Sequence, residues 1–354
     1  MCIRDRSSTA DLIGNRVLQS RSLESWSSLA ESLDDDAMRA QVLANRALHA
    51  DRVGDLARAE VLAGQAVEVA ERCANARAAA LACGELGWLL LQRRLVDESE
   101  ARFRRGLHWA RRAAVEMKHP RDDYFVPMLL TMLSTVLLEK NELDAALASL
   151  REALAMAQAG HHLRDVCGCH DWLVVVALRL FDLPLAREHT EAMADIAGRI
   201  GLAVLVAAVP TKRGEIALLE GRFDDAAALA QEGAAAMAKL GLSQPEGSAL
   251  GVAGAALAEA GSHAEARALY QRGHDAYAKP DLEHDMRASR LLIADTWRAE
   301  GDLSQAMTLL EAEMPALEGS GGLRASDLAA RMAAWRVLHA AGDARAASQL
   351  TLAR

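Results

Sequence analysis

The chain has 354 residues, of which 51% are hydrophobic and only 4% aromatic, and its formal net charge is −9. This acidic balance argues against a general nucleic-acid surface, which needs clustered positive charge to displace counterions. The five cysteines are sparse and irregularly spaced, which excludes a disulfide framework and indicates a reducing cytoplasm. No apolar stretch reaches the roughly 18 residues of a membrane helix, so we expect no membrane contact.

A six-residue pattern, typified by Gly54–Ala59 (GDLARA), recurs through the chain. The later copies begin at Arg94, Asn141, Phe181, Gly221, Gly261, Gly301 and Gly342, at successive intervals of 40, 47, 40, 40, 40, 40 and 41 residues. A fixed period of this length is typical of one supersecondary unit stacked on copies of itself. The sequence therefore predicts a helical solenoid.

Each copy of the pattern predicts a tight turn between two helices. Gly221 follows an apolar run, where a left-handed residue ends a helix, and Asp224 and Asp225 fall in the first turn of the next helix. Beyond each turn an apolar residue is followed, three positions later, by a small residue that lets two helices approach closely. The small residues are Ala59, Ser99, Ala146, Ala186, Ala226, Ala266, Ala306 and Ala347. The predicted unit is helix A, a tight turn, helix B, and a loop to the next helix A.

In chain order, residues 1–8 are expected to be a non-native leader, since they resemble a translated cloning junction and lack the apolar run of a signal peptide. Residues 9–35 are predicted to form a partial leading repeat and residues 36–354 the repeat array. The last residues, 349–354, continue a helical pattern without the polar cap that a solenoid needs. We therefore expect the array to be truncated at its C-terminus and the chain to be a fragment.

The prolines and one long interval modify this regular pattern. The 47-residue interval predicts an insertion near His119–Phe125, with Pro120 ending the preceding helix. Pro127 and Pro184 fall in first turns of predicted helices, where proline is tolerated. Pro210 lies within a predicted helix A and predicts a kink or a late helix start.

These residues resemble tetratricopeptide repeats, whose motif has a large then a small residue on helix A, a Gly–Asp/Asn–aromatic turn, and a small residue opening helix B. Leu86-Gly87 with Ser99, and Leu133-Ser134 with Ala146, match that motif. The period is longer than the family's usual length of about 34 residues, and the helix A tryptophan and tyrosine are mostly absent. HEAT-type repeats have a similar period, but the Gly-Asp-Leu turn favours the tetratricopeptide interpretation.

The resemblance implies an all-α, right-handed solenoid of about eight helix–turn–helix repeats. A period of 40 residues is similar to that of the longer repeats found C-terminal to ATPase modules in bacterial signalling proteins and transcription regulators. In the resembled family helix A lines the concave face of the superhelix, where peptides or small effectors lie. Carried over by register, this nominates Trp88, Thr131, Thr135, Asp171, Thr211, Glu215, Asp295, Arg298 and Arg336 as groove residues. For Trp88, packing between neighbouring A helices is an equal alternative.

The sequence offers little for chemistry. It contains no Gly-x4-Gly-Lys-Ser/Thr loop, and the glycine-rich segment at 319–322 lacks a lysine and predicts a plain linker. Cys167, Cys169 and His170 carry zinc-ligand groups, but no second cysteine pair completes a four-ligand site. We expect buried thiols at a helix start and no metal, with metal binding the alternative. Asp171 and Glu215 could form a carboxylate pair, but no nucleophile accompanies them.

One local run of arginines has two interpretations, a solvated helix face or a patch for an acidic partner. The run consists of Arg93, Arg94, Arg102, Arg104, Arg105, Arg111 and Arg112.

We therefore expect a non-enzymatic, cytoplasmic, bacterial scaffold that uses no cofactor and binds a protein, a peptide or a small effector in its groove. It is expected to be the C-terminal sensor or docking region of a larger regulator, with an ATPase domain upstream, and to contact neither nucleic acid nor membrane. A free-standing adaptor and the tail of a nucleotide-cyclase-type enzyme are the alternatives.

Overall fold

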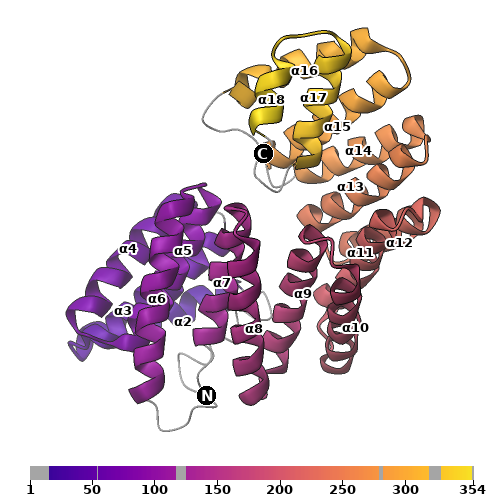
Figure 1. Cartoon of the computed structure of the whole chain (residues 1–354). Helices are drawn as coiled ribbons and strands as arrows, with labels where there is room; N and C mark the ends of the chain where they lie inside the picture. The colour runs from indigo at the N-terminus through magenta and orange to yellow at the C-terminus, as the bar shows by residue number, and fades with distance from the viewer. Residues whose placement is uncertain (1–15, 54, 117–124, 279–281, 319–327, 353–354) are drawn as a thin grey trace. The chain divides into compact units, whose positions relative to one another are not determined.

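The computed structural model describes residues 16–53, 55–116, 125–278, 282–318 and 328–352, and the regular structure in these ranges is entirely helical (Figure 1). The chain divides into two compact units, Met1–Cys169 and His170–Arg354, a division that the sequence did not predict. None of the described helices is both long enough and apolar enough to cross a bilayer. The predicted leader, residues 1–8, and the glycine-rich segment, 319–322, lie outside the described ranges.

The described helices form one leading helix and eight consecutive pairs, which confirms the predicted repeat number. The first unit holds α2 (Arg16–Ser32), α3 (Asp36–Arg52), α4 (Leu56–Arg72), α5 (Ala76–Gln92), α6 (Val96–Glu116), α7 (Phe125–Glu139) and α8 (Leu143–Ala159). Helix α9 (Leu163–Arg179) contains the boundary between the units. The second unit continues with α10 (Leu183–Ile200), α11 (Ala203–Leu219), α12 (Phe223–Lys239), α13 (Ser243–Glu259), α14 (His263–Ala278), α15 (Glu283–Ala299), α16 (Leu303–Glu318), α17 (Leu328–Ala340) and α18 (Ala346–Leu352).

The recurring Gly-Asp pattern ends one helix and begins the next. The first residue adopts the left-handed conformation, as at Gly301 with φ of 90°, and ends the preceding helix. Where the second residue is Asp55, Asp182 or Asp302, its side chain caps the next helix, and the Asp302 carboxylate accepts a hydrogen bond of 3.0 Å from the backbone N–H of Gln305. Asn75 caps α5 in the same way, through Ala78 N–H at 2.9 Å.

The same turn also follows the B helices α4, α8, α10 and α12. The predicted loop from helix B to the next helix A is therefore wrong at these four connections. From Asn141 to Gly261 the left-handed residues follow one another at intervals of 20, half the sequence repeat. After Gly201, which follows α10, the Leu202 backbone N–H donates a hydrogen bond of 2.9 Å to the Ala197 carbonyl. This is the hydrogen bond that closes such a turn. The structural unit is therefore a single helix plus a three-residue turn, repeated twice in each pair.

The predicted small positions are the contact points between paired helices. All of them from Ala59 to Ala306 have 0% exposure, whereas Ala347 is exposed. The prediction is wrong at Ala347, because the connection between α17 and α18 spans residues 341–345 instead of three residues and Ala346 takes the buried position.

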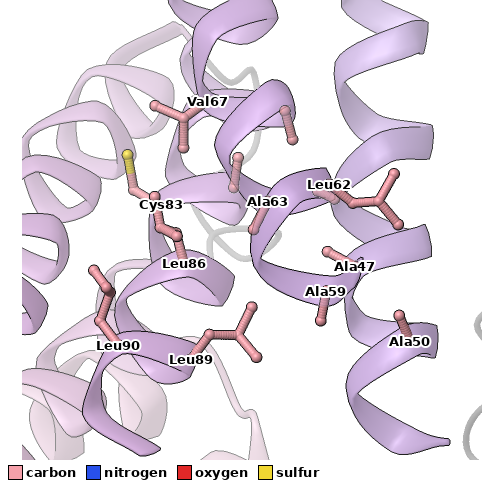
Figure 2. Close-up of a cluster of buried hydrophobic side chains, with 13 residues drawn as sticks. Ala47, Ala50, Ala59, Leu62, Ala63, Val67, Cys83, Leu86, Leu89 and Leu90 are labelled. Carbon is pink, nitrogen blue, oxygen red and sulfur yellow. The ribbon is translucent and has the colours of Figure 1, made fainter. Parts of the chain in front are cut away.

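Alanine-sized side chains bring the helices of the first unit together. Figure 2 shows Ala47 of α3 beside Ala59 and Ala63 of α4, with leucines of α5, among them Leu86 and Leu89, completing the cluster. Small residues at such contacts let backbones approach closely, while the leucines fill the space between successive pairs.

The proline predictions are partly confirmed. Pro127 and Pro184 lie in the first turns of α7 and α10. Pro210 lies inside α11, which begins at Ala203, so the predicted late start is wrong. The left-handed turn at Gly201 fixes where α11 begins, and the helix continues through the proline. The predicted insertion lies almost wholly in 117–124, outside the described residues.

Replacing Ala226 by leucine is expected to destabilise the second unit by about 1–3 kcal/mol through overpacking. Ala226 is fully buried, and on the facing helix a Cβ at Gly214 would already lie 3.1 Å from the Ala226 carbonyl oxygen. Urea unfolding measures the effect, with Ala228→Leu as the control, because Ala228 is an exposed alanine of the same helix. Equal stability of the two variants would contradict the register.

Candidate ligand-binding face

Helices α11, α13, α15 and α17 are the A helices of the second unit. Helix α13 packs against α11, and α15 packs against α17. Between α13 and α15 lies a hollow of about 320 Å³, and residues of helix α14 also line it. Its lining comprises Gln244, Gly247, Ser248, Gly251, Tyr270, Gly273, Tyr277, Asp285, Ala288, Ser289 and Leu292. The side of the unit formed by these four A helices is called the A-helix face.

Glycines of α13 shape this hollow. A Cβ at Gly247 would lie 2.7 Å from the ring of Tyr277, and one at Gly254 would lie 2.7 Å from the ring of Tyr270. The glycines thus let two buried tyrosine rings pack directly against the α13 backbone. Gly251 faces open space, since a Cβ added there would meet no atom within 4 Å.

The polar groups that line the hollow are few and mostly neutral. Gln244 and Ser248 supply neutral polar groups at its edge, and the Ser289 hydroxyl donates to the Asp285 backbone carbonyl at 3.1 Å. Asp285 is the single ionisable carboxylate among the lining residues, and burial raises the pKa of Tyr270 well above its usual range. A tyrosine floor with a few polar groups at the edge is typical of a ligand pocket.

Three of the predicted groove residues meet at the ends of α15 and α17. The Asp295 carboxylate accepts hydrogen bonds from Arg298 Nε at 2.5 Å and from Arg336 Nη1 at 3.0 Å. The cluster therefore holds α15 to α17 and carries a net charge of +1.

Two further predicted residues, Asp171 and Glu215, flank a lysine, Lys212, which was not among the predicted groove residues. Lys212 Nζ lies 4.0 Å from Asp171 and 3.6 Å from Glu215. Burial alone would lower the pKa of Lys212, but the two carboxylates outweigh it and hold the pKa above its usual value. The predicted carboxylate pair is thus a pair of counter-ions for one lysine.

The threonines make local contacts. Thr211 Oγ1 is buried against Gly233, where an added Cβ would lie 2.1 Å away. In the first unit, Thr131 and Thr135 donate to the backbone carbonyls of Pro127 and Met132 at 2.9 and 2.7 Å. Trp88 lies half-buried on α5 in the same unit.

The architecture matches several solved structures. A Rap protein in complex with competence and sporulation factor is 12% identical, with 99% of this chain and 95% of that chain covered at a TM-score of 0.73. The quorum sensor NprR from B. thuringiensis is 13% identical over 99% and 96% of the two chains, with a TM-score of 0.62. A signal-transduction ATPase from Pyrococcus horikoshii that has a tetratricopeptide repeat sensor is 11% identical, with a TM-score of 0.55. The match covers 96% of this chain and 52% of that protein.

The fold is a tetratricopeptide-like helical array. No protein-family model and no curated protein sequence matches the chain. The structural likeness therefore establishes the architecture of the array and leaves its ligand to be argued from the residues.

The hollow of the tetratricopeptide-like array was missed because it is made by small residues. Asp171, Thr211 and Gly251 occupy the same position in successive 40-residue repeats. Because glycine has no side-chain functional group, this position did not point to a binding residue in α13. The available signal was the run Gly247, Ser248, Gly251 and Gly254 along one predicted helix A.

The basic run of the array is largely paired. Arg111 Nη2 lies 2.9 Å from Glu152, Arg112 Nε lies 3.0 Å from Glu116, and Arg105 forms a two-pronged pair with Glu71. These pairs favour the interpretation as a solvated helix face.

The cysteine–histidine cluster forms part of helix α9 and its packing. Cys167 and Cys169 are buried, and burial raises the pKa of the Cys169 thiol to about 11. Within the described ranges, no three His, Cys, Asp or Glu side chains are grouped so as to hold a metal ion. The next residue, His170, contacts His189 of α10 at 3.0 Å between the Nδ1 atoms.

Acid is expected to destabilise the array through this histidine pair. Burial, and then the neighbouring His189, lower the pKa of His170 to about 4 from an ordinary 6.5. Between these values the unfolded chain takes up a proton that the folded chain does not, so stability falls as pH falls through this window. The slope is at most about 1.4 kcal/mol per pH unit. Urea midpoints of wild type and His170→Gln, measured from pH 7 to 4.5, should converge on the acid side. Parallel curves would contradict the assignment.

Proposed function

We propose that the chain is a non-enzymatic binding protein that takes a peptide or small effector on its A-helix face, with the α13–α15 hollow as the anchoring pocket. The observation that carries this is the 320 Å³ hollow floored by Tyr270 and Tyr277. Tyrosine rings give large contact areas at low entropic cost, and pockets of this size accept a side chain or a small molecule. The Rap neighbour, which was solved with competence and sporulation factor, supports a regulator that binds a signalling ligand.

The finer proposal is that this array is the sensor or docking region of a larger bacterial, cytoplasmic regulator linked to an ATPase. The link to an ATPase is supported by the similarity to the Pyrococcus ATPase, of which this chain spans about half, 52%. Ligand binding at α13–α15 would change the contact between neighbouring repeats, and a solenoid passes such a change to the adjoining repeats.

The experiment is a peptide-display selection on the full chain, followed by affinity measurement on wild type and a pocket-filled variant, Gly251→Phe. The new ring enters open space, so the variant should fold, and replacing a helical glycine favours the helix. We expect the selected peptides to bind Gly251→Phe at least tenfold more weakly than wild type.

The matched control is Gly198→Phe in α10, another helical glycine of the same unit whose Cβ would meet nothing within 4 Å. Binding should be unchanged in this control. Peptides that bind both variants as they bind wild type would overturn the assignment of the pocket.

A further inference from the structure

A second hollow, of about 180 Å³, lies in the first unit among α2, α3 and α4. Its floor is apolar and consists of the buried side chains of Leu23, Ala50 and Leu62. The volume equals that of about six waters in the liquid, which is the scale of one small metabolite.

Four charged side chains from three helices surround this floor: Glu24 of α2, Arg46 of α3, and Asp55 and Arg58 at the start of α4. Among the described residues, neither arginine forms an ion pair with a carboxylate, although two carboxylates line the same hollow. Within the described ranges the carboxylates make local hydrogen bonds only. Glu24 accepts from the Ser20 hydroxyl at 3.3 Å, and Asp55 accepts from the backbone N–H of Arg58 at 3.2 Å.

Several other arginines of the unit are paired across helices. Arg105 and Arg111, for example, each reach a carboxylate on another helix. Two cations and two anions held apart around an apolar floor are complementary to a ligand that carries both charges. A pure anion would face the carboxylates, and a pure cation would face the guanidinium groups.

We propose that the α2–α4 hollow binds a zwitterion the size of an α-amino acid with an aliphatic side chain. The guanidinium groups of Arg46 and Arg58 take the ligand carboxylate, since planar donors match that group. Glu24 and Asp55 take the ammonium group, and the side chain covers Leu23, Ala50 and Leu62. The site is independent of the A-helix face.

Titration calorimetry of the full chain with L-leucine tests this assignment, with L-leucinamide and 4-methylpentanoate as probes that lack one charge each and glycine as the probe without a side chain. We expect L-leucine to bind at least tenfold more tightly than each of the three. Arg46→Gln and Glu24→Gln should each weaken L-leucine binding at least tenfold.

Arg151→Gln is the matched control, because Arg151 is an exposed arginine of α8 outside the hollow. It should leave L-leucine binding unchanged, as should Gly251→Phe, so failure of the A-helix pocket and failure of this site are distinguishable. Absence of L-leucine binding at millimolar concentration would overturn the proposal. Equal binding of 4-methylpentanoate or L-leucinamide, or an equal loss in Arg151→Gln, would also overturn it.

Discussion

Replacing Glu313 by alanine is expected to lower the free energy of unfolding by about 3–5 kcal/mol, because it leaves two arginines near a vacated, buried position. The Glu313 side chain on α16 is only 8% exposed and accepts from Arg287 Nε at 3.2 Å and from Arg290 Nε at 2.5 Å, both on α15. Arg290 also contacts Glu283 at 2.6 Å and His274 of α14 at 3.1 Å. Glu313 is therefore the centre of a polar cluster with side chains from three helices.

The measurement is urea unfolding combined with hydrogen exchange, since a repeat array can open locally at the weakened pair. Protection should be lost first in α15 and α16. Glu311→Ala is the control: its pair with Arg345 involves side chains exposed by 47% and 35%, and such pairs contribute about 0–1 kcal/mol. The triple replacement of Glu313, Arg287 and Arg290 by methionine should recover most of the loss. Comparable losses in Glu313→Ala and Glu311→Ala would contradict the argument.

The turns that the sequence predicted lie between helix A and helix B, and the clearest of them place a left-handed glycine beside a capping aspartate. Gly301 and Asp302 supply a left-handed residue and a cap, so the pattern can be read locally. The turns after helix B use the same geometry with residues such as Ala74 and His161, whose φ values are 51° and 58°. Nothing in an alanine indicates a left-handed backbone, since residues with a Cβ adopt it rarely.

The candidate site was harder to predict, because its pairs lie far apart in sequence. Asp171 with Lys212 and Asp295 with Arg336 each join residues 41 apart on neighbouring A helices. Asp295 and Arg336 occupy the same repeat position, because the last interval is 41 residues, whereas Asp171 and Lys212 lie one position out of register across a 40-residue interval. The position of the groove residues thus follows from the repeat, but the repeat alone does not specify the counter-ion. The run of small residues on α13 is the sequence signal for the hollow at Gly251, and the open space around that residue is seen only in the structure.

Replacing Phe103 by alanine is expected to cost about 3–5 kcal/mol, the loss typical of a large buried ring. Phe103 of α6 is 0% exposed, and its ring covers Gly87 of α5, the small residue of the Leu86-Gly87 motif. The same turn of α5 is fixed by Ser99, whose hydroxyl donates to the Gly87 carbonyl at 2.7 Å. Ring, glycine and hydroxyl therefore form one contact between the paired helices.

The contact can be tested from the opposite side with Gly87→Ala. The added Cβ would lie 2.7 Å from the Phe103 ring, so this variant should lose about 1–3 kcal/mol despite the better helix propensity of alanine. Combining Gly87→Ala with Phe103→Leu removes the clash. The double variant should then be more stable than the sum of the two single losses predicts, and urea unfolding of all four proteins measures this coupling. Strict additivity of the two losses in stability would mean that the Phe103 ring does not pack against Gly87. The small residue of the helix A motif could then not be explained by the packing of a helix B side chain against a glycine.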